Sequence, residues 1–494
     1  MNNKSFRHNI EITVFLLIIF SFKSSQALSL SEFIINYSNF SYVKDISTTL
    51  SNIYIATSGG IIRYDHIEEK WLEPLTGNPD LDESNIQYIW SNQFDNKLYV
   101  KTVDQFYEYD NFLNRWYRIQ EIAEKNLNEK HIDPPQIMFA PPGHIYSSSG
   151  FLIDKYNRNF PFSVFLDDGS GNFWIGMWGN GIARANISST VIELLPYGLL
   201  QNSVTFIYND DGYLWMGGDP PFNGKSGLTF FDPDNNYFEY LENGLESDFP
   251  LVNINCMGSY DDFYVVGTSE GIYFLDPDNL SVEQHINHRR GLPDRNVNTL
   301  QTVGDSLFVG TEMGMAIITS AGEDVKYFRP DQFLTTRFYD FELVDSSLWI
   351  ASSAGAFRLN LNSNKLQRFQ DPELFLFGEV FDIERESGYL WFSAREGALR
   401  LDMAASETKS FQSASSSFRK RPIAANSQFT AIASDNSLTF IFFNKSPILY
   451  KELTTDDGLV SNNILSLELD GDFIWIGTDL GLSRFEWKNQ IWIE

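Results

Sequence analysis

The chain has 494 residues, of which 43% are hydrophobic and 15% aromatic, enough apolar mass for one large domain or for two or three ordinary ones, so a disordered chain is excluded. Its formal net charge is -29 at pH 7, which argues against binding to nucleic acid or to an anionic membrane surface, because both require basic patches. Thirty-three glycines and eighteen prolines are spread along the chain, as expected for many short elements joined by turns.

The N-terminus has the pattern of a secretory signal. Lys4 and Arg7 precede an apolar stretch at 12–22, and small residues lead up to Ala27. Eleven apolar positions are too few for a bilayer span, which takes about 20 residues. We therefore predict a signal peptide at 1–27 that is cleaved after Ala27. The mature protein is expected to be periplasmic, secreted or at the cell surface, without membrane insertion.

A short apolar burst recurs through the rest of the chain, and its clearest copy is FIWIGTDLGLSRFEW at 473–487. Eleven copies align on an aromatic or apolar residue that stands two positions before a small one. These are Tyr54, Tyr99, Tyr146, Trp174, Trp215, Val265, Phe308, Trp349, Trp391, Phe440 and Trp475. Most of the steps between them lie between 41 and 50 residues, with short steps of 28 and 35. This spacing is typical of propeller blades of about 40 to 45 residues.

Each copy is predicted to form strands and not helices, because its apolar runs are only four to six residues long and end in turns. In NSVTFIYNDDGYLWMGG, a strand at 204–208 turns through Asp211-Gly212 into the strand that holds Trp215. A third and an outer strand complete a four-stranded antiparallel sheet. Such a sheet buries both faces only between neighbours, so the sequence predicts an all-β β-propeller. Small residues beside the aromatic strand, such as Gly267, are interpreted as packing positions.

About eleven units exceed the four to eight blades of one propeller, so we expect two rings. The two short steps bracket seven units. They suggest a seven-bladed ring at about 160–450, inserted between 28–159 and 451–494, which would form a second ring. A single wide ring is the open alternative.

Several of these copies resemble the two-component-regulator propeller repeat. Residues 456–486, DDGLVSNNILSLELDGDFIWIGTDLGLSRFE, match it along their whole length, and residues 291–317 and 242–276 match it well. The resemblance implies an extracytoplasmic sensor-type β-propeller, as in the input region of hybrid sensor kinases or in exported surface-assembly proteins. No kinase, receiver or transmembrane segment follows, so we expect that the chain does not transmit a signal alone.

The motifs that could suggest an enzyme or a metal site are better explained as parts of the structural repeat. GTSEG at 267–271 matches G-x-S-x-G, but a strand follows it where the nucleophile elbow requires a helix. His285 and His288 lack a clear third ligand, and the DPDN turns lack the glycine and glutamate of a calcium loop. Cys256 is the only cysteine, so no disulfide framework exists. No catalytic residue, metal or cofactor is predicted.

Aromatic residues in turns are the better indication of a binding site. Trp178 lies in the turn MWGNG, and the same turn of the next unit carries the insertion GDPPFNGKS at 218–226. We hypothesise that Trp178 and Phe222 stack on a ligand ring, with Asp219 and Lys225 giving hydrogen bonds. The alternative is a tryptophan that folds onto its own blade.

The sequence thus predicts an exported, non-enzymatic recognition or interaction module whose partner is a glycan ligand or an envelope protein. An assembly role in surface secretion is a neighbouring version of this interpretation. A polysaccharide hydrolase or lyase on a propeller scaffold is the alternative from another class, and a carboxylate or histidine cluster at a ring mouth would favour it.

Overall fold

The structure is a computed structural model that describes residues 30–78, 81, 83–92, 96–120, 139–147, 149–186, 188–222, 224–243, 249–319, 324–328, 336–413 and 420–488. The predicted signal peptide lies outside these ranges. In the part of the chain so described, no helix is long and apolar enough to cross a membrane.

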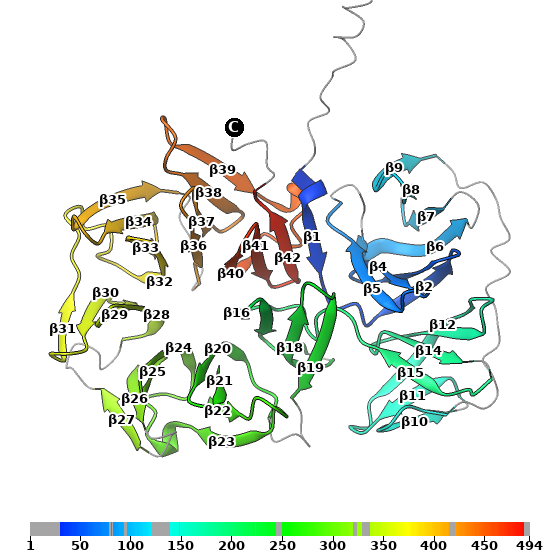
Figure 1. Ribbon diagram of the computed structural model, residues 1–494, viewed down its shortest axis with the longest axis horizontal. Helices are drawn as coiled ribbons and strands as arrows, with labels where there is room; N and C mark the ends of the chain where they lie inside the picture. The colour runs from blue at the N-terminus through cyan, green and yellow to red at the C-terminus, as the bar shows by residue number, and fades with distance from the viewer. Residues whose placement is uncertain are drawn as a thin grey trace, which may run out of the picture.

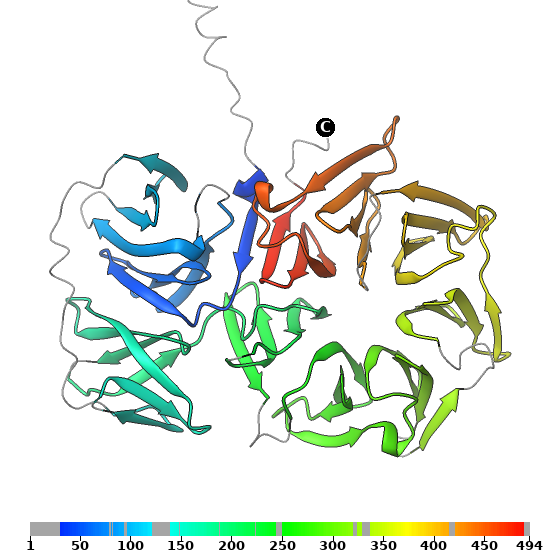
Figure 2. The same cartoon turned by 180° about the vertical axis from the view of Figure 1, so that it is seen from behind.

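Seven antiparallel sheets stand radially around a common axis, on the left of Figure 1 and the right of Figure 2. We call them the seven-sheet ring. In chain order, their strands are β16 (Phe206–Asp210), β17 (Tyr213–Gly217), β18 (Gly227–Asp232) and β19 (Tyr237–Glu242); β20 (Ile254–Tyr260), β21 (Phe263–Thr268), β22 (Gly271–Leu275) and β23 (Val282–Ile286); β24 (Val297–Val303), β25 (Ser306–Thr311), β26 (Gly314–Thr319) and β27 (Asp324–Phe328); β28 (Phe338–Val344), β29 (Ser347–Ser352), β30 (Gly355–Asn360) and β31 (Lys365–Arg368); β32 (Val380–Glu386), β33 (Tyr389–Ala394), β34 (Gly397–Asp402) and β35 (Glu407–Gln412); β36 (Ile423–Ala425), β37 (Thr430–Ala433), β38 (Leu438–Phe442) and β39 (Leu449–Leu453); and β40 (Ile464–Asp470), β41 (Phe473–Thr478) and β42 (Leu482–Glu486).

The N-terminal strand closes this ring. Strand β1 (Ile34–Tyr37), which follows a short 3-10 helix η1 (Leu30–Phe33), pairs antiparallel with β42 and supplies the fourth strand of the last sheet. The inner strand β16 of the first sheet then contacts both β20 and β40. The ring is therefore closed by residues more than 400 positions apart in the sequence.

Three further sheets lie beside the ring, on the right of Figure 1, and we call them the three-sheet group. Their strands are β2 (Val43–Thr48), β3 (Asn52–Thr57), β4 (Gly60–Asp65) and β5 (Lys70–Leu75); β6 (Ile86–Asn92), β7 (Lys97–Thr102), β8 (Phe106–Asp110) and β9 (Arg115–Ile119); and β10 (His144–Ser147), β11 (Phe151–Asp154), β12 (Asn159–Asp167), β13 (Asn172–Met177), β14 (Ile182–Asn186) and β15 (Ile192–Leu195). Strand β2 packs between β6 and β12.

The β-propeller architecture is confirmed, but the count of units and their division differ from the sequence prediction. The described residues form ten sheets, because the units at Tyr146 and Trp174 share one six-stranded sheet through the long strand β12. This sharing explains the short step of 28 residues. The predicted ring at 160–450 is wrong at both ends, since the seven-sheet ring begins at 206 and includes the terminal unit and β1.

The small residues of the second strands are packing positions, as the sequence indicated. A Cβ atom on Gly267 would lie 2.8 Å from Val297, the first residue of the next inner strand. Gly310 has the same relation to Phe338, and a Cβ on Gly477 would lie 2.7 Å from Val204, in the segment just before β16. Neighbouring sheets therefore approach each other so closely that any side chain at these positions would push them apart.

A repeated threonine fixes the turn between the second and third strands. The buried hydroxyl of Thr311 donates to the carbonyl oxygen of Gly314 at 2.7 Å and accepts the amide of Met313 at 3.3 Å. Thr57, Thr268, Ser352 and Thr478 make the equivalent bonds. The glycine is required because its φ is positive and because, at the equivalent Gly271, a Cβ would lie 2.3 Å from Ile286 O.

Replacing this hydroxyl should have a measurable cost. Thr311→Val keeps the shape of the side chain but removes its hydrogen bonds to the Gly314 carbonyl and the Met313 amide, so we expect a loss of about 1–2 kcal/mol in the free energy of unfolding. Urea denaturation of the variant measures it. Thr408→Val, on the partly exposed outer strand β35, serves as the control and should change stability by less than about 0.5 kcal/mol.

The two groups of sheets share one hydrophobic core. Tyr37 and Trp475 of the ring belong to the same buried cluster as Tyr197, which lies on the segment that leads into the ring. The Tyr197 ring stacks on Trp71 of β5 at 4.4 Å and meets Phe238 of β19 edge-on at 5.1 Å. This aromatic packing holds the three-sheet group against the ring.

Candidate functional site

One face of the seven-sheet ring is built from turns and connecting segments. In each of four sheets, a residue of the turn between the second and third strands donates its amide to the residue that leads into the inner strand. The pairs are Ser269 to Asn253, Glu312 to Asn296, Ser353 to Arg337 and Asp479 to Asn463, at 2.9–3.4 Å. These bonds place the side chains of both segments around the ring opening. We call this surface the loop face.

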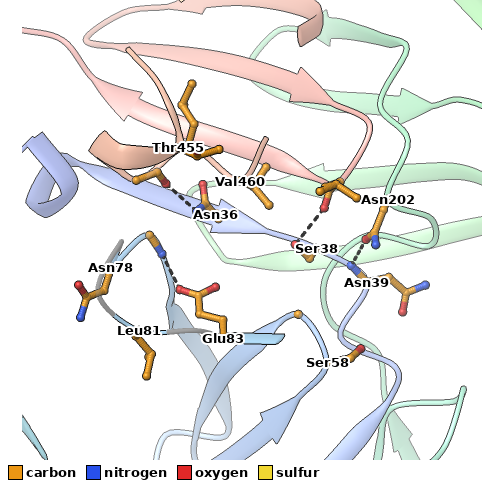
Figure 3. A pocket seen from close by; sticks show the side chains of 15 residues that line it. Asn36, Ser38, Asn39, Ser58, Asn78, Leu81, Glu83, Asn202, Thr455 and Val460 are labelled. Carbon is orange, nitrogen blue, oxygen red and sulfur yellow. Dashed lines mark hydrogen bonds between the residues drawn. The ribbon is translucent and has the colours of Figure 1, made fainter. Parts of the chain in front are cut away.

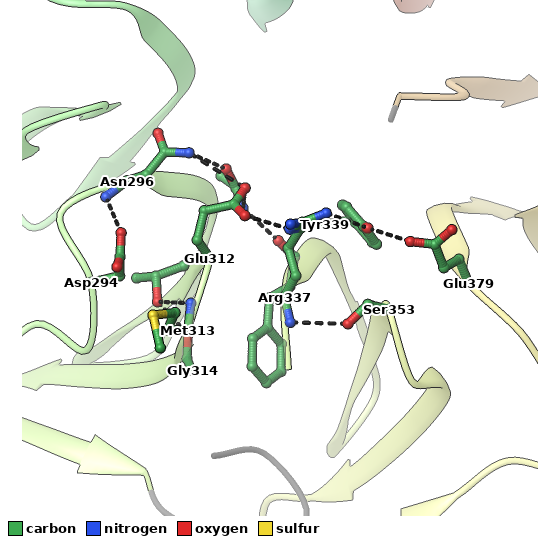
Figure 4. Close-up of polar contacts among 12 residues, drawn as sticks. Asp294, Asn296, Glu312, Met313, Gly314, Arg337, Tyr339, Ser353 and Glu379 are labelled. Atoms are coloured by element: carbon green, nitrogen blue, oxygen red, sulfur yellow. Dashed lines mark hydrogen bonds and ion pairs between the residues drawn. The ribbon is translucent and has the colours of Figure 1, made fainter. Parts of the chain in front are cut away.

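A chain of charged and polar side chains runs along the loop face over three sheets (Figure 4). Arg337 pairs with Glu312 of the preceding sheet and lies 3.4 Å from the Tyr339 hydroxyl. Tyr339 donates to Glu379 at 2.9 Å, and Arg395 reaches the other oxygen of Glu379 at 2.6 Å. Acidic and basic groups therefore alternate and hold one another in fixed positions before any ligand arrives.

The network continues on both sides of Glu312. Its Oε1 accepts the Asn298 amide at 3.2 Å, while Asn298 also donates to the Phe338 carbonyl of the next sheet at 3.0 Å. One sheet earlier, Arg295 pairs with Glu270 at 3.2 Å. Since both members of that pair are half-exposed, the loop face presents ionised groups to solvent.

The ring opening itself holds a lysine and an aspartate. Lys420 donates from Nζ to the Thr205 carbonyl at 2.9 Å, which joins the segment before β36 to the segment before β16. Asp219, in the turn that the sequence singled out, accepts the Asn253 amide at 2.7 Å. Burial lowers the pKa of the Lys420 ammonium, and the carboxylates of Asp219 and Asp382 oppose this shift.

A pocket of about 370 Å³ lies where the ring meets the three-sheet group (Figure 3). Its walls hold amides and hydroxyls whose positions are fixed. Asn36 donates to the Gly458 carbonyl at 2.9 Å, and the Asn39 amide donates to Asn202 Oδ1 at 2.7 Å. Glu83, which accepts the Gly77 amide at 2.9 Å, is the charged residue among the described lining residues. The wall of this pocket therefore presents amides, hydroxyls and one carboxylate.

Carboxylates line the inner strands below the loop face. Glu342, Glu384 and Glu468 each stand directly opposite a tryptophan of the second strand, namely Trp349, Trp391 and Trp475, so they share one register position. Burial raises the pKa of Glu342 to about 7, with a further contribution from Asp340. Burial likewise raises the pKa of Glu468 to about 7.

Glu384 is influenced by both of these neighbours. Burial raises its pKa well above the usual range, and the carboxylates of Glu342 and Glu468 raise it further. The three groups are therefore near enough to repel one another when charged. Carboxylates with raised pKa are the type of group that acts as a general acid, which is the chemistry that the alternative function requires.

Two aspartates nearby have a structural role. Asp340 accepts the amide of Ile383 in the next sheet at 3.1 Å, and Asp382 accepts the amide of Ile423 at 2.8 Å. Asp45 bonds to Ile89 in the same way in the three-sheet group. These carboxylates join neighbouring sheets, because each accepts a hydrogen bond from a backbone N–H of the inner strand in the next sheet.

The four residues predicted as a binding platform separate into two places. Trp178 is 49% exposed and lies edge-on to Tyr42 at 5.2 Å. Lys225 donates to Asn180, in the Trp178 turn, at 2.7 Å and pairs with Glu242 at 3.2 Å. Phe222 is fully exposed. Asp219 instead faces the ring opening, so the structure brings Trp178 and Lys225 together through Asn180, and their role in binding stays a prediction.

The other motifs lie in structural surroundings. Ser269 lies in the turn between β21 and β22, as the repeat indicated, and its hydroxyl accepts the Asn253 amide at 3.3 Å. His285 stacks on Tyr273 at 4.2 Å, and His288 lies in the short 3-10 helix η4 (His288–Arg290). Burial raises the pKa of Cys256 to about 12, so its thiol keeps its proton at neutral pH.

Comparisons with known proteins show similarity in architecture at low identity. No protein-family model matches the sequence, and no curated protein matches it. PorZ, an essential surface component of the type-IX secretion system of Porphyromonas gingivalis, is 14% identical with a TM-score of 0.49, over 90% of this chain and 68% of that chain. The extracellular domain of the hybrid two component system BT4673 from B. thetaiotaomicron is 12% identical with a TM-score of 0.45, over 90% and 70%.

BamB from Moraxella catarrhalis is 12% identical with a TM-score of 0.39, over 66% of this chain and 96% of that chain. Since these TM-scores lie below 0.5, the assignment of a β-propeller rests on the strand pairing and sheet contacts of the chain itself.

Proposed function

We propose that the chain is an exported, non-enzymatic recognition module that binds a glycan or an envelope partner protein on the loop face of the seven-sheet ring. The observation that carries the proposal is the network from Glu312 through Arg337 and Tyr339 to Glu379 and Arg395. Its side chains are fixed by one another, so a ligand that replaces solvent on them loses little side-chain entropy.

Two sequence expectations support the same proposal. The signal peptide predicted at 1–27 would export the chain, and the resemblance of 456–486 to the two-component-regulator propeller repeat suggests membership in a family of extracytoplasmic sensor propellers. Loops carried by a rigid scaffold are also where binding residues concentrate in proteins.

A binding experiment on the mature protein tests the proposal. The protein is applied to a glycan array, and in parallel to immobilised envelope extract with identification of retained proteins by mass spectrometry. Any hit is then measured with Arg337→Ala and Arg395→Ala, which should weaken binding at least tenfold while changing stability by no more than about 1 kcal/mol. Lys326→Ala, on the outer strand β27, is the matched control. Equal binding by all variants would remove the loop face as the site.

A hydrolase that acts on polysaccharide is a second candidate, because Glu342, Glu384 and Glu468 occupy one register position with raised pKa. In that case a protonated carboxyl would donate its proton to the glycosidic oxygen, and a second carboxylate would activate water or attack the sugar. Incubation with array hits and product analysis distinguishes the two functions. If a product forms and the Glu384→Gln variant no longer makes it, the protein is an enzyme and the recognition proposal is wrong. Binding without product would support recognition.

A further inference from the structure

A second concave surface lies between the ring and the three-sheet group, apart from the loop face. This groove has a volume of about 1040 Å³ and is lined by η1 and β1, by β5, by the β8–β9 hairpin and by β42. We call it the junction groove. Its volume exceeds that of a site for one small molecule and suits a chain of several sugar or amino-acid units.

The junction groove carries a local excess of basic groups in a strongly acidic protein. Its described lining includes four arginines, Arg63, Arg115, Arg118 and Arg484, and three glutamates, Glu32, Glu73 and Glu486. The whole chain instead has 36 basic and 65 acidic residues. A ligand with negative charge would therefore meet more favourable surroundings here than the composition of the whole chain offers.

The arginines are held in place by the protein. Arg63 donates twice to the Glu73 carbonyl, at 2.9 and 3.1 Å, and Arg484 pairs with the Glu73 carboxylate at 2.5 Å. Arg118 donates from Nε to Gln105 at 2.8 Å. Arg115 pairs with Glu32 of η1 at 3.7 Å. These contacts keep the four guanidinium groups oriented and use only some of the five N–H donors that each group carries.

The hairpin that carries Arg115 and Arg118 also supplies aromatic surface. Trp116 packs on Tyr109 with ring centres 5.0 Å apart, and Tyr117 is 42% exposed. Flat aromatic side chains beside arginines fit a ligand that alternates apolar ring faces with charged groups. A chain of sugar rings that bear carboxylates has this alternation, whereas an acidic peptide offers charge on flexible side chains without ring faces.

We infer that the junction groove is a binding site for a carboxylated oligosaccharide, in which Arg115 and Arg118 pair with uronate carboxylates and Trp116 and Tyr117 contact the sugar rings. A guanidinium fork matches a carboxylate through two parallel hydrogen bonds. This site lies beyond the loop face, so its occupation is independent of the ligand proposed for the ring.

Isothermal titration of the mature protein with uronate tetrasaccharides tests the inference. The panel contains galacturonate, mannuronate and guluronate tetramers, with neutral maltotetraose and a tetraglutamate peptide for comparison. We expect at least one uronate to bind, and its Kd to rise at least tenfold in the Arg115→Ala/Arg118→Ala variant and in 0.5 M NaCl. Lys326→Ala should bind as the unchanged protein does.

The variants separate this inference from the proposed function. Arg337→Ala should leave uronate binding unchanged, because that residue lies on the loop face. Absence of binding to every uronate, equal binding of maltotetraose, tighter binding of tetraglutamate, or a double variant with unaltered affinity would each overturn the inference. None of these outcomes bears on recognition at the loop face.

Discussion

Replacing Glu342 and Glu468 by glutamine should stabilise the protein at pH 8 by several kcal/mol and leave its stability near pH 4 almost unchanged. Both carboxyls have a pKa raised by burial to about 7, against 4.5 for the free side chain. Below pH 4.5 the groups are protonated in the folded and the unfolded chain alike. As the pH rises from 4.5 to 7, the unfolded chain ionises while the folded carboxyls keep their protons, so folding becomes less favourable.

The size of the effect follows from the shift in pKa. Each pKa unit corresponds to about 1.4 kcal/mol, so each group costs at most about 3–4 kcal/mol once the pH exceeds 7. The surrounding charges act in both directions. Asp340 raises the pKa of Glu342 and Arg385 lowers it, while Asp470 raises that of Glu468 and a hydrogen bond with Asn209 lowers it.

Chemical denaturation at half-unit steps from pH 4 to pH 8 measures this difference. The curve of the unchanged protein should fall between pH 4.5 and 7, and the Glu342→Gln/Glu468→Gln curve should fall less over the same range. Glu283→Gln, at an exposed position on β23, serves as the control and should follow the unchanged protein. Parallel curves for the double variant and the control would show that the two carboxyls titrate normally and are not buried in the folded protein.

Arg421→Ala should cost about 3–5 kcal/mol in the free energy of unfolding. The side chain is 1% exposed, and its guanidinium donates to the carbonyls of Ala433 and Ala394 at 2.8 and 2.5 Å and to Ser413 at 2.6 Å. It therefore links the sheet of β32–β35 to the sheet of β36–β39. Removing it takes these hydrogen bonds from buried carbonyl groups and leaves a cavity between two sheets.

Comparison with two other variants identifies the cause. Arg421→Met retains most of the volume and removes the hydrogen bonds together with the buried charge, so it should be nearly as destabilising as alanine if the bonds to the carbonyl groups determine the loss. Arg289→Ala, at an exposed position of η4, should change stability by less than about 0.5 kcal/mol. An Arg421→Ala variant as stable as Arg289→Ala would mean that these two sheets do not depend on the guanidinium.

The repeat itself was predictable because its residues serve local needs. Thr311 and Gly314 form one turn, and Gly310 accommodates the adjacent sheet, so each pattern is visible within a few residues of sequence. The division into rings was not predictable in the same way. It depends on the pairing of β1 with β42 and on the sharing of β12 by two units, and neither leaves a local pattern in the sequence.

The buried glutamates of the ring could have been found from their spacing in the sequence. Glu342, Glu384 and Glu468 each stand seven positions before an aligned tryptophan, and the repeat alignment contained that information. Arg421 had no such signal. It precedes the degenerate unit near Phe440, and its partners are backbone carbonyls from two segments, at 394–395 and at Ala433, and the hydroxyl of Ser413. The binding hypothesis grouped Asp219 with Trp178 because it relied on turn position alone, whereas the structure turns Asp219 toward the ring opening.

Hydrogen exchange of the mature protein tests the central claim, which is that β1 closes the seven-sheet ring. Peptides that cover 34–37 and 482–486 are followed by mass spectrometry under native conditions. If the ring is closed as described, the amides of β1 that point toward β42 are protected and open together with those of β42, because the two strands share one ladder of hydrogen bonds. Rapid exchange throughout β1 beside a protected β42 would contradict this closure.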